Sequence, residues 1–229
     1  MRVAVVNFSG NVGKSTLARH LLAPRFNTEL IAVETINADE GGENIRASQF
    51  DELQGHLLTN DVAVIDVGAS NIEAFIHAMN QYRKSHEDFD YFVIPVVSEV
   101  KQQKDTIATI EALMTLGIPP KKIRVVFNKV EATADVLEEF GPIFGYAEAE
   151  KKCVVRPDAT VYVNDVFEKS KGLGKTVSEI LIDPTDYRAK LKESKDEDER
   201  ESCVQMILAK RLAESAGENL DAVFKVLFK

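Results

Sequence analysis

One eight-residue segment constrains the fold of this chain more than any other. It reads Ser-Gly-Asn-Val-Gly-Lys-Ser-Thr over residues 9–16, directly after the β-branched run Arg2–Asn7 and directly before a helix-like segment, residues 17–22. A glycine-containing turn between a buried strand and a helix points several backbone N–H groups at one place, where the helix N-terminus adds partial positive charge. The segment therefore predicts a strand–loop–helix unit that binds phosphate.

Within this loop, Lys14 is predicted to reach the β- and γ-phosphates of a nucleotide, and Ser15 to bind Mg²⁺. The match to the general pattern is incomplete, because Phe8 stands where a first glycine is usual, and an ordinary βα turn is the alternative. The context between strand and helix favours phosphate binding. The other loop residues predicted to contact the nucleotide are Gly10, Asn11, Val12, Gly13 and Thr16.

A second glycine-lysine string, Gly174-Lys175-Thr176, has no buried strand before it. It is predicted to be a loop, with Lys175 in solvent.

The first two-thirds of the chain alternates short apolar runs with segments of helical spacing. The later runs are Leu30–Ile36, Val62–Asp66, Tyr91–Val97 and Ile123–Asn128. They are nearly continuous in apolar residues, which is typical of parallel strands covered on both faces. Pro95 is expected near the C-terminal end of its strand. Two apolar stripes are predicted to be core faces of helices: Ile72, Phe75, Ile76 and Met79, and Ile107, Ile110, Leu113 and Met114. The alternation predicts βαβ units and a parallel α/β sheet.

After about Lys151 the pattern weakens. Residues 1–229 are predicted to form a single domain, whose last part, from about residue 181, consists of closing helices. The elements expected here are a last strand at Cys153–Val155, a loop or short strand at Val161–Val166, a solvated charge run at Lys192–Ser202, and helices at Val204–Leu212 and Leu220–Phe228.

Three further polar positions follow predicted strands. Asp66 ends a buried run and is predicted to support Mg²⁺, with a plain turn residue as the alternative. Asp39, in Asn-Ala-Asp-Glu-Gly-Gly, is predicted to orient an attacking water; Glu34 competes for that role, and a polar turn is the alternative. The amide of Asn128 is expected to bind a base edge. Glu131 stands where a GTPase prefers Asp, so guanine recognition is not favoured.

Composition excludes several function classes. The formal net charge is −9, which disfavours nucleic-acid binding through bulk charge. Two cysteines cannot form a disulfide framework, and the N-terminus lacks the pattern of a secretory signal, so a cytoplasmic location is expected. The four histidines (His20, His56, His77 and His86) show no metal-ligand spacing.

Taken in order, the segments SGNVGKST, NADEGG, AVIDVG, FVIPVVSEVKQQ and VVFNKVE resemble the ParA/MinD group of deviant Walker ATPases. The resemblance covers roughly residues 1–180 and is closest to StbB-type plasmid stability and conjugation proteins. It implies a doubly wound, mostly parallel sheet with helices on both faces, and ATP and Mg²⁺ as cofactors. It also implies a homodimer that ATP holds together and hydrolysis releases.

The function predicted from this resemblance is an ATP-dependent molecular switch for plasmid positioning, stability or conjugative transfer. Two alternatives remain open. One is a metabolic ATP-dependent ligase or kinase on the same fold, and the other is a nucleotide-sensing module with little turnover.

One departure from the family loop bears on turnover. The first lysine of the family pattern KGGxGK[ST], which crosses to the partner subunit, is Ser9 here, and Asn11 replaces a glycine. A neutral hydroxyl cannot replace a cation at developing phosphate charge. The sequence therefore predicts weak hydrolysis, or a substitute cation such as Arg46 or Lys101.

The resemblance also concerns partners. Because the net charge is −9, a DNA-binding adaptor protein is expected, and direct non-specific DNA binding is not. MinD-like members end in an amphipathic membrane helix, and Leu220–Lys229 places Leu220, Val223, Phe224 and Leu227 on one face. Packing of this face on the core is favoured over membrane contact.

Overall fold

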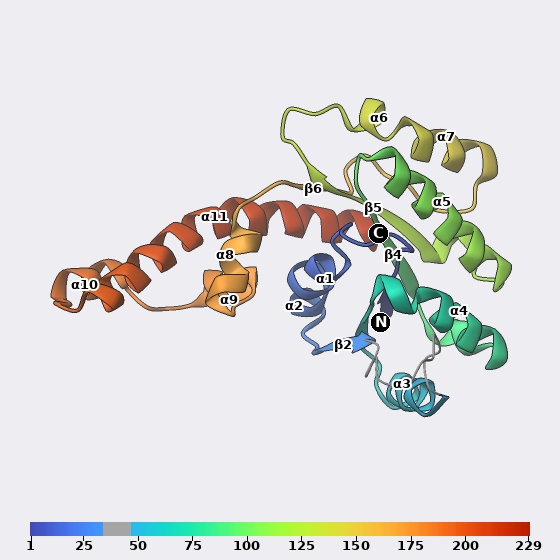
Figure 1. The fold of residues 1–229 in the computed structure, drawn as a ribbon, viewed down its shortest axis with the longest axis horizontal. Helices are drawn as coiled ribbons and strands as arrows, with labels where there is room; N and C mark the ends of the chain where they lie inside the picture. Colours follow the sequence, from blue (N-terminus) through green and yellow to red (C-terminus); the bar gives the residue numbers. More distant parts are fainter. Residues whose placement is uncertain (34–46) are drawn as a thin grey trace.

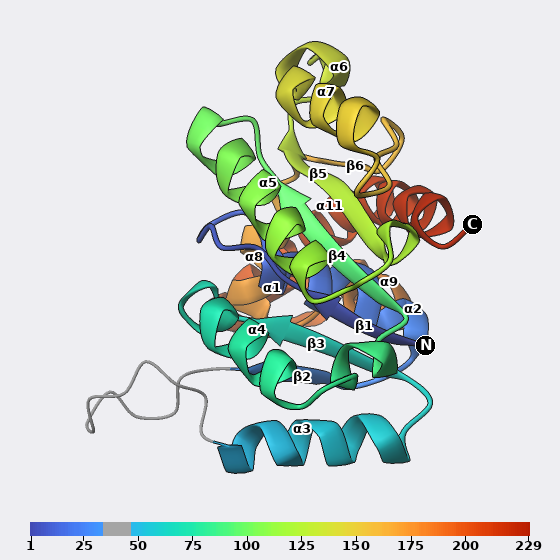
Figure 2. The ribbon, with the colours of Figure 1, turned by 90° about the vertical axis from the view of Figure 1, so that its right-hand side faces the viewer.

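Within the residues that the computed structural model describes, 1–33 and 47–229, the strands form one parallel sheet (Figures 1 and 2). Their order is β2-β3-β1-β4-β5-β6, so the first strand lies near the middle. The bounds are β1 Arg2–Val5, β2 Leu30–Val33, β3 Ala63–Val67, β4 Tyr91–Val96, β5 Ile123–Val130 and β6 Thr160–Tyr162. The five apolar runs are thus confirmed as strands within the described residues, which exclude 34–36 of the second run, and Pro95 lies one residue before the end of β4.

Helices cover both faces of this sheet. On one face lie α3 (Ala47–Thr59), α4 (Ile72–Gln81), α5 (Val100–Thr115), α6 (Val136–Glu139) and α7 (Gly141–Glu150). On the other lie α8 (Val166–Leu173), α9 (Val177–Ile182), α11 (Glu197–Leu227) and the continuous helical stretch Lys14–Phe26, which comprises α1 (Lys14–Thr16), a π-helical segment (Leu17–Leu22) and α2 (Ala23–Phe26). Figure 2 shows α4 and α5 in front of the sheet and α8 and α9 behind it. The doubly wound α/β architecture is confirmed.

Adjacent residues of one strand pack into opposite layers. Val3 and Val5 of β1 lie in the core beneath α11, whereas Ala4 and Val6 lie in the core beneath α4 and α5. Because successive strand residues point to opposite faces, a strand covered on both sides must be apolar at every position. This explains why the strands read as continuous apolar runs.

The far edge of the sheet differs from the prediction. Cys153–Val155 is not a strand: it contributes only an isolated bridge between Val154 and Arg124, and the last strand is β6. The side chain of Asn219 covers the open edge of β6, because its Oδ1 accepts from the Tyr162 N–H (3.1 Å) and its Nδ2 donates to the Thr160 carbonyl (2.9 Å). An amide thus replaces the neighbouring strand that an edge strand lacks.

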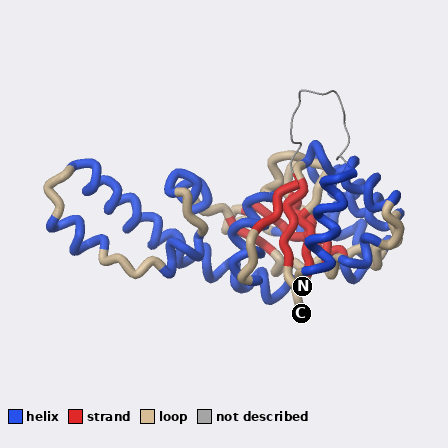
Figure 3. The backbone as a smooth tube through the Cα atoms, turned by 90° about the horizontal axis from the view of Figure 1, so that it is seen from below, coloured by secondary structure: helices blue, strands red, loops and turns tan. Residues whose placement is uncertain are grey.

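The two predicted closing helices are one helix, α11, of 31 residues. Its first part projects beyond the sheet and pairs with α10 (Tyr187–Glu193), and we call residues 187–211 the arm (Figures 1 and 3). The charge run Lys192–Ser202 forms the far end of the arm, as the end of α10, a turn and the start of α11. It is a loop and helix face, as predicted.

The C-terminal half of α11 is buried on the sheet. Leu220, Val223 and Leu227 lie in the core, and the ring of Phe224 contacts those of Phe26 and Phe228, each at 5.0 Å between centroids. The apolar face that resembles a membrane helix is therefore covered by the protein itself, as the favoured interpretation held. In the described residues, no helix is both long and apolar enough to cross a bilayer.

Leu220→Ala tests this packing. Leu220 is fully buried, so truncation removes apolar contacts and leaves a cavity, and we expect a loss of about 2–5 kcal/mol in unfolding free energy. Urea unfolding followed by circular dichroism measures it. Leu58→Ala is the matched control, because Leu58 is 66% exposed on α3, and we expect a change below about 0.5 kcal/mol there. Equal effects of the two substitutions would contradict the packing.

Candidate functional site

The carboxyl ends of β1, β3, β4 and β5 meet at one edge of the sheet, and the 9–16 loop lies there. Val5, the last residue of β1, is in register with Asp66 of β3 on one side and with Val93 of β4 on the other. The chain fills the sheet first on one side of β1, with β2 and β3, and then on the other, with β4 to β6. Such a reversal leaves a crevice beyond the strand ends, which is the usual ligand position in open α/β sheets.

The loop backbone requires glycine at one position. Gly13 has φ +88°, and a Cβ there would lie 2.1 Å from Asn128 Nδ2. Any side chain would therefore both strain the backbone and collide with Asn128. Asn11 also has a left-handed conformation, with φ +59°, which asparagine tolerates better than most residues.

Lys14 is 7% exposed, and its ammonium points back along the loop. Its Nζ donates to the carbonyls of Asn7 (3.0 Å) and Ser9 (2.7 Å). Burial lowers the pKa of Lys14 to about 8, and the charge of Asp66 opposes that shift. A phosphate in the loop would thus meet a cation that has already lost most of its water.

Two oxygen-bearing side chains predicted to hold Mg²⁺ come from adjoining elements. Asp66 is 8% exposed near the end of β3, and Ser15 is exposed in the first turn of α1. Carboxylate and hydroxyl oxygens are ligands that Mg²⁺ accepts, and it typically takes few protein ligands together with substrate phosphates. Among residues 1–33 and 47–229, no three His, Cys, Asp or Glu side chains form a metal-binding group.

Ser9 is held by α5. Its Oγ donates to Asp105 Oδ2 (2.6 Å) and its backbone N–H to Asn7 Oδ1 (2.8 Å). Asn7 in turn donates through Nδ2 to Thr106 Oγ1 (2.7 Å). The backbone N–H of Phe8 donates to Thr109 Oγ1 (3.0 Å). Sequence reasoning missed this network. Its only signal in the sequence was the pair of threonines on α5, and both are fully buried on that helix beside Gln103, Ile110 and Leu113.

Asn128 contacts the backbone of the loop. It is buried, and its Nδ2 donates to the Val12 carbonyl (2.8 Å). The next residue, Lys129, has φ +57° at a register shift in β5, and its Nζ donates to the Asn11 carbonyl (2.9 Å). One N–H group of the Asn128 amide therefore holds the 9–16 loop, and its role at a base edge stays a prediction.

The remaining predicted positions separate into two groups. Lys101 is exposed in the first turn of α5, which begins at the same edge of the sheet as the loop. Asp39, Glu34 and Arg46 lie outside the described residues.

The prediction for the second glycine-lysine string is wrong in one respect. Gly174 ends α8 with φ +64°, and Thr176 begins α9 with a capping box, so the string is a loop between helices. Lys175, however, is not simply in solvent: its Nζ lies 2.7 Å from Asp183 Oδ2.

His20 is buried in the helix that follows the loop, and its role is structural. Its Nδ1 accepts from the Val177 N–H (3.2 Å), and its Nε2 lies 3.4 Å from Ser170 Oγ. Burial lowers the pKa of His20 to about 4, so the ring is neutral at pH 7. His20 thereby ties the loop's helix to α8 and α9.

Comparison with known proteins gives matches only among solved structures. No family model and no curated protein sequence matches this chain. The MinD cell division protein of Aquifex aeolicus is similar with 13% identity and a TM-score of 0.49, over 93% of this chain and 96% of that one. Apo McdA of Cyanothece is similar with 13% identity and a TM-score of 0.48, over 90% and 98%. A putative plasmid partition protein of Borrelia burgdorferi B31, bound to AMPPNP, has 11% identity and a TM-score of 0.46, over 91% and 97%.

His20 makes stability depend on pH. Its folded pKa of about 4 lies below the ordinary value of 6.5, so the unfolded chain binds a proton first as pH falls. The stabilisation is complete above pH 6.5 and is lost between about pH 6.5 and 4. At 1.36 kcal/mol per pKa unit, we expect its contribution to fall by about 2 kcal/mol from pH 7.5 to pH 5.

Urea unfolding at the two pH values measures this loss. His20→Asn is the control, because its Oδ1 still offers an acceptor to the Val177 N–H and does not titrate. Between pH 7.5 and pH 5, we expect the unfolding free energy of this variant to fall by about 2 kcal/mol less than that of the wild type. An identical pH dependence of wild type and His20→Asn would contradict the assignment.

Proposed function

We propose that this protein is an ATP-binding molecular switch that hydrolyses ATP slowly. The observation that carries the proposal is the Lys14 ammonium, which is buried and held by the carbonyls of Asn7 and Ser9, between a central strand and a helix N-terminus. A desolvated cation beside oriented backbone N–H groups is an arrangement suited to a polyphosphate.

Each candidate residue has a definite part in this proposal. The backbone of residues 10–16 surrounds the phosphates, and Lys14 carries the positive charge to them. Ser15 and Asp66 would hold Mg²⁺, which when bound neutralises phosphate charge and orients the phosphates. The water-orienting role proposed for Asp39 rests on its sequence context alone.

More specifically, we propose a switch of the ParA/MinD type that acts, like StbB-type proteins, in plasmid stability, partition or conjugative transfer. The ordered motifs of residues 1–180 and the doubly wound sheet support it. In this proposal ATP brings two copies together, and a separate adaptor protein contacts DNA, since the chain carries a net charge of −9.

One observation favours a second candidate, a nucleotide sensor with little turnover. Ser9 occupies the position of the family's bridging lysine, and its hydroxyl is bound to the Asp105 carboxylate. That position therefore supplies no cation, and an anionic group lies beside it. The two candidates share nucleotide binding and differ in hydrolysis.

Light scattering of the full chain tests the switch. With Mg²⁺ and ATP we expect a mass twice the 25.4 kDa of the monomer, and with ADP the monomer mass. Lys14→Ala should remain monomeric in both. Lys121→Ala is the matched control, because Lys121 is exposed just before β5, at the amino ends of the strands, whereas the 9–16 loop lies at their carboxyl ends.

Parallel measurements of ATP affinity and phosphate release separate the candidates. ATP binding and dimerisation without phosphate release would favour the sensor. Binding with a mass that ignores nucleotide would favour an ATP-dependent ligase or kinase. No ATP binding by the wild-type chain would overturn the proposal.

Asn128→Ala tests the role of the loop support. Because the lost hydrogen bond is to the Val12 carbonyl and not to a base, we expect ATP and GTP affinities to fall by the same factor. A net hydrogen-bond contribution of about 1 kcal/mol corresponds to roughly fivefold. Titration of fluorescent ATP and GTP analogues measures both constants. A change in their ratio above about threefold would instead show that Asn128 reads the base.

A further inference from the structure

The outer face of the arm carries an apolar groove between α10 and α11. Its cavity volume is about 360 Å³. Four apolar residues form its floor and walls: Leu191, Val204, Ile207 and Leu208. Three basic residues complete the lining: Arg188, Lys192 and Arg211. No acidic residue is among those lining the groove in this described part of the chain, although the protein has a net charge of −9.

Helical spacing explains why these residues share one surface. Arg188, Leu191 and Lys192 are at i, i+3 and i+4 of α10, and the α11 residues are at i, i+3, i+4 and i+7, counted from Val204. Residues at these spacings lie on one face of a helix. Val204 and Leu208 are each 39% exposed, so apolar surface remains open to an occupant.

The basic residues of the groove form no ion pair with an acidic side chain of the described residues. Other cations nearby are engaged: Lys190 lies 3.1 Å from Glu199, and Arg200 donates to the carbonyls of Leu191 (2.8 Å) and Ser194 (3.2 Å). Within residues 1–33 and 47–229, no ion pair involves Arg188, Lys192 or Arg211. Their charge is available to a partner.

The groove is preformed by contacts at both ends of α10. At its start, Asp183 accepts from the hydroxyl of Tyr187 (2.8 Å) and pairs with Lys175, and the ammonium of Lys210 donates to the Asp183 carbonyl. At its end, Ser194 donates to Glu199 (2.6 Å). An occupant therefore does not have to pay for ordering these helices.

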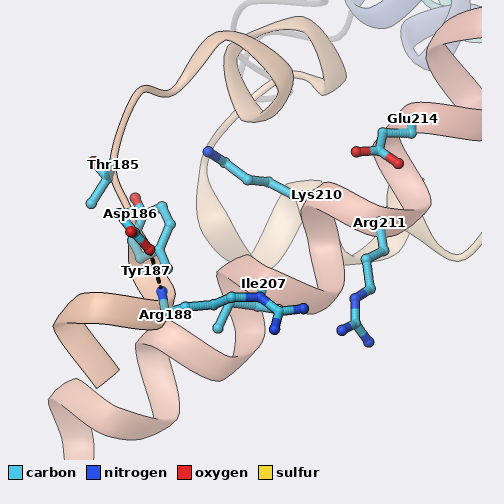
Figure 4. A pocket seen from close by; sticks show the side chains of 8 residues that line it. All are labelled: Thr185, Asp186, Tyr187, Arg188, Ile207, Lys210, Arg211 and Glu214. Carbon is cyan, nitrogen blue, oxygen red and sulfur yellow. Dashed lines mark hydrogen bonds between the residues drawn. The ribbon is translucent and has the colours of Figure 1, made fainter. Parts of the chain in front are cut away.

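A second, polar cavity of about 370 Å³ adjoins the groove (Figure 4). It shares Arg188, Ile207 and Arg211 with the groove, and it adds the carboxylates of Asp186 and Glu214. In Figure 4, Arg188 comes from α10 and lies beside Ile207 of α11. The groove therefore combines apolar side chains with basic residues alone, whereas the adjoining cavity also contains acidic ones.

We propose that the groove binds an amphipathic, acidic helical segment of a partner protein. Its apolar side chains would enter between Leu191 and Leu208, and its carboxylates would pair with Arg188, Lys192 and Arg211. This is the helix-in-groove mode of recognition, in which apolar anchors give affinity and flanking charges give specificity.

The lining of the groove argues against two other occupants. A nucleic-acid backbone offers phosphate charge but no apolar side chains to fill the space lined by Leu191, Val204 and Leu208. The acidic end of a second copy offers carboxylates but little exposed apolar surface to fill the groove. A separate segment that carries both apolar and acidic side chains satisfies both halves of the lining.

The test uses the full chain without nucleotide and a fluorescent synthetic peptide of about 14 residues, close to four helical turns. The peptide has leucines on one face flanked by glutamates, and fluorescence anisotropy measures binding. A scrambled peptide and a peptide with lysine for each glutamate are the probes for specificity. Lys192→Glu and Lys195→Glu form a matched pair of variants, because both lysines are exposed and only Lys192 lines the groove.

We expect saturable binding of the acidic peptide to wild type and Lys195→Glu, at least about tenfold weaker binding to Lys192→Glu, and weaker binding of both control peptides. Val204→Ser should also weaken binding, whereas Val163→Ser, at an exposed valine outside the arm, should not. Lys14→Ala should bind as wild type does, which separates this result from the fate of the proposed ATP switch.

Three outcomes would overturn the proposal. One is binding that is absent, or equal in Lys192→Glu and Lys195→Glu. Another is duplex DNA binding that Lys192→Glu abolishes while the acidic peptide fails to compete, which would make the groove a nucleic-acid surface. The third is a concentration-dependent dimer, seen by light scattering, that only Lys192→Glu dissociates, which would assign the groove to a second copy of this chain.

Discussion

The rest of the candidate site depends on how the chain stabilises the buried ammonium of Lys14. Removing an ammonium from water is costly unless other groups solvate it, and here the carbonyls of Asn7 and Ser9 do so. The Ser9 carbonyl begins the 9–16 loop and the Asn7 carbonyl lies just before it, so this part of the chain must keep one conformation for the charge to be tolerated. The supports found around it serve that end: Asp105 and the threonines of α5 hold its first half, and Asn128 and Lys129 hold its second.

Much of the fold was predictable because burial on two faces leaves a simple mark on a sequence. The five continuous apolar runs, the stripes of α4 and α5, and the strand–loop–helix around Lys14 follow from local composition and spacing. The limits of prediction appear after residue 151, where the elements are short and their pairing depends on distant partners. β6 has three residues, and its edge is covered by Asn219, which lies 59 residues beyond Thr160. No local pattern encodes such a contact.

The candidate site shows the same division. Spacing was enough to place Lys14 in a loop between a strand and a helix and Asp66 near the end of a buried strand, and their roles toward phosphate and Mg²⁺ stay predictions. Spacing could not reveal what Ser9 and Asn128 contact, since Asp105 and Val12 reach them only after the sheet has formed. For the same reason Lys175 was expected in solvent: its partner, Asp183, lies eight residues away across α9. A polar side chain's type limits what it can bind, but tertiary structure decides which group it binds.

The loop and the arm belong to one packed unit, although they lie at different ends of the chain. The helix that follows the loop contacts α9 through His20 and the Val177 N–H, and α9 packs closely on α11, where a Cβ at Gly217 would lie 2.7 Å from Leu181 Cδ1. The absence of a side chain at Gly217 thus lets α9 approach α11 closely at this point. The long helix α11 therefore has two tasks in one element. Its buried C-terminal half fixes its direction against the sheet, and that fixed direction in turn holds the exposed cations and apolar residues of the arm clear of the negatively charged body.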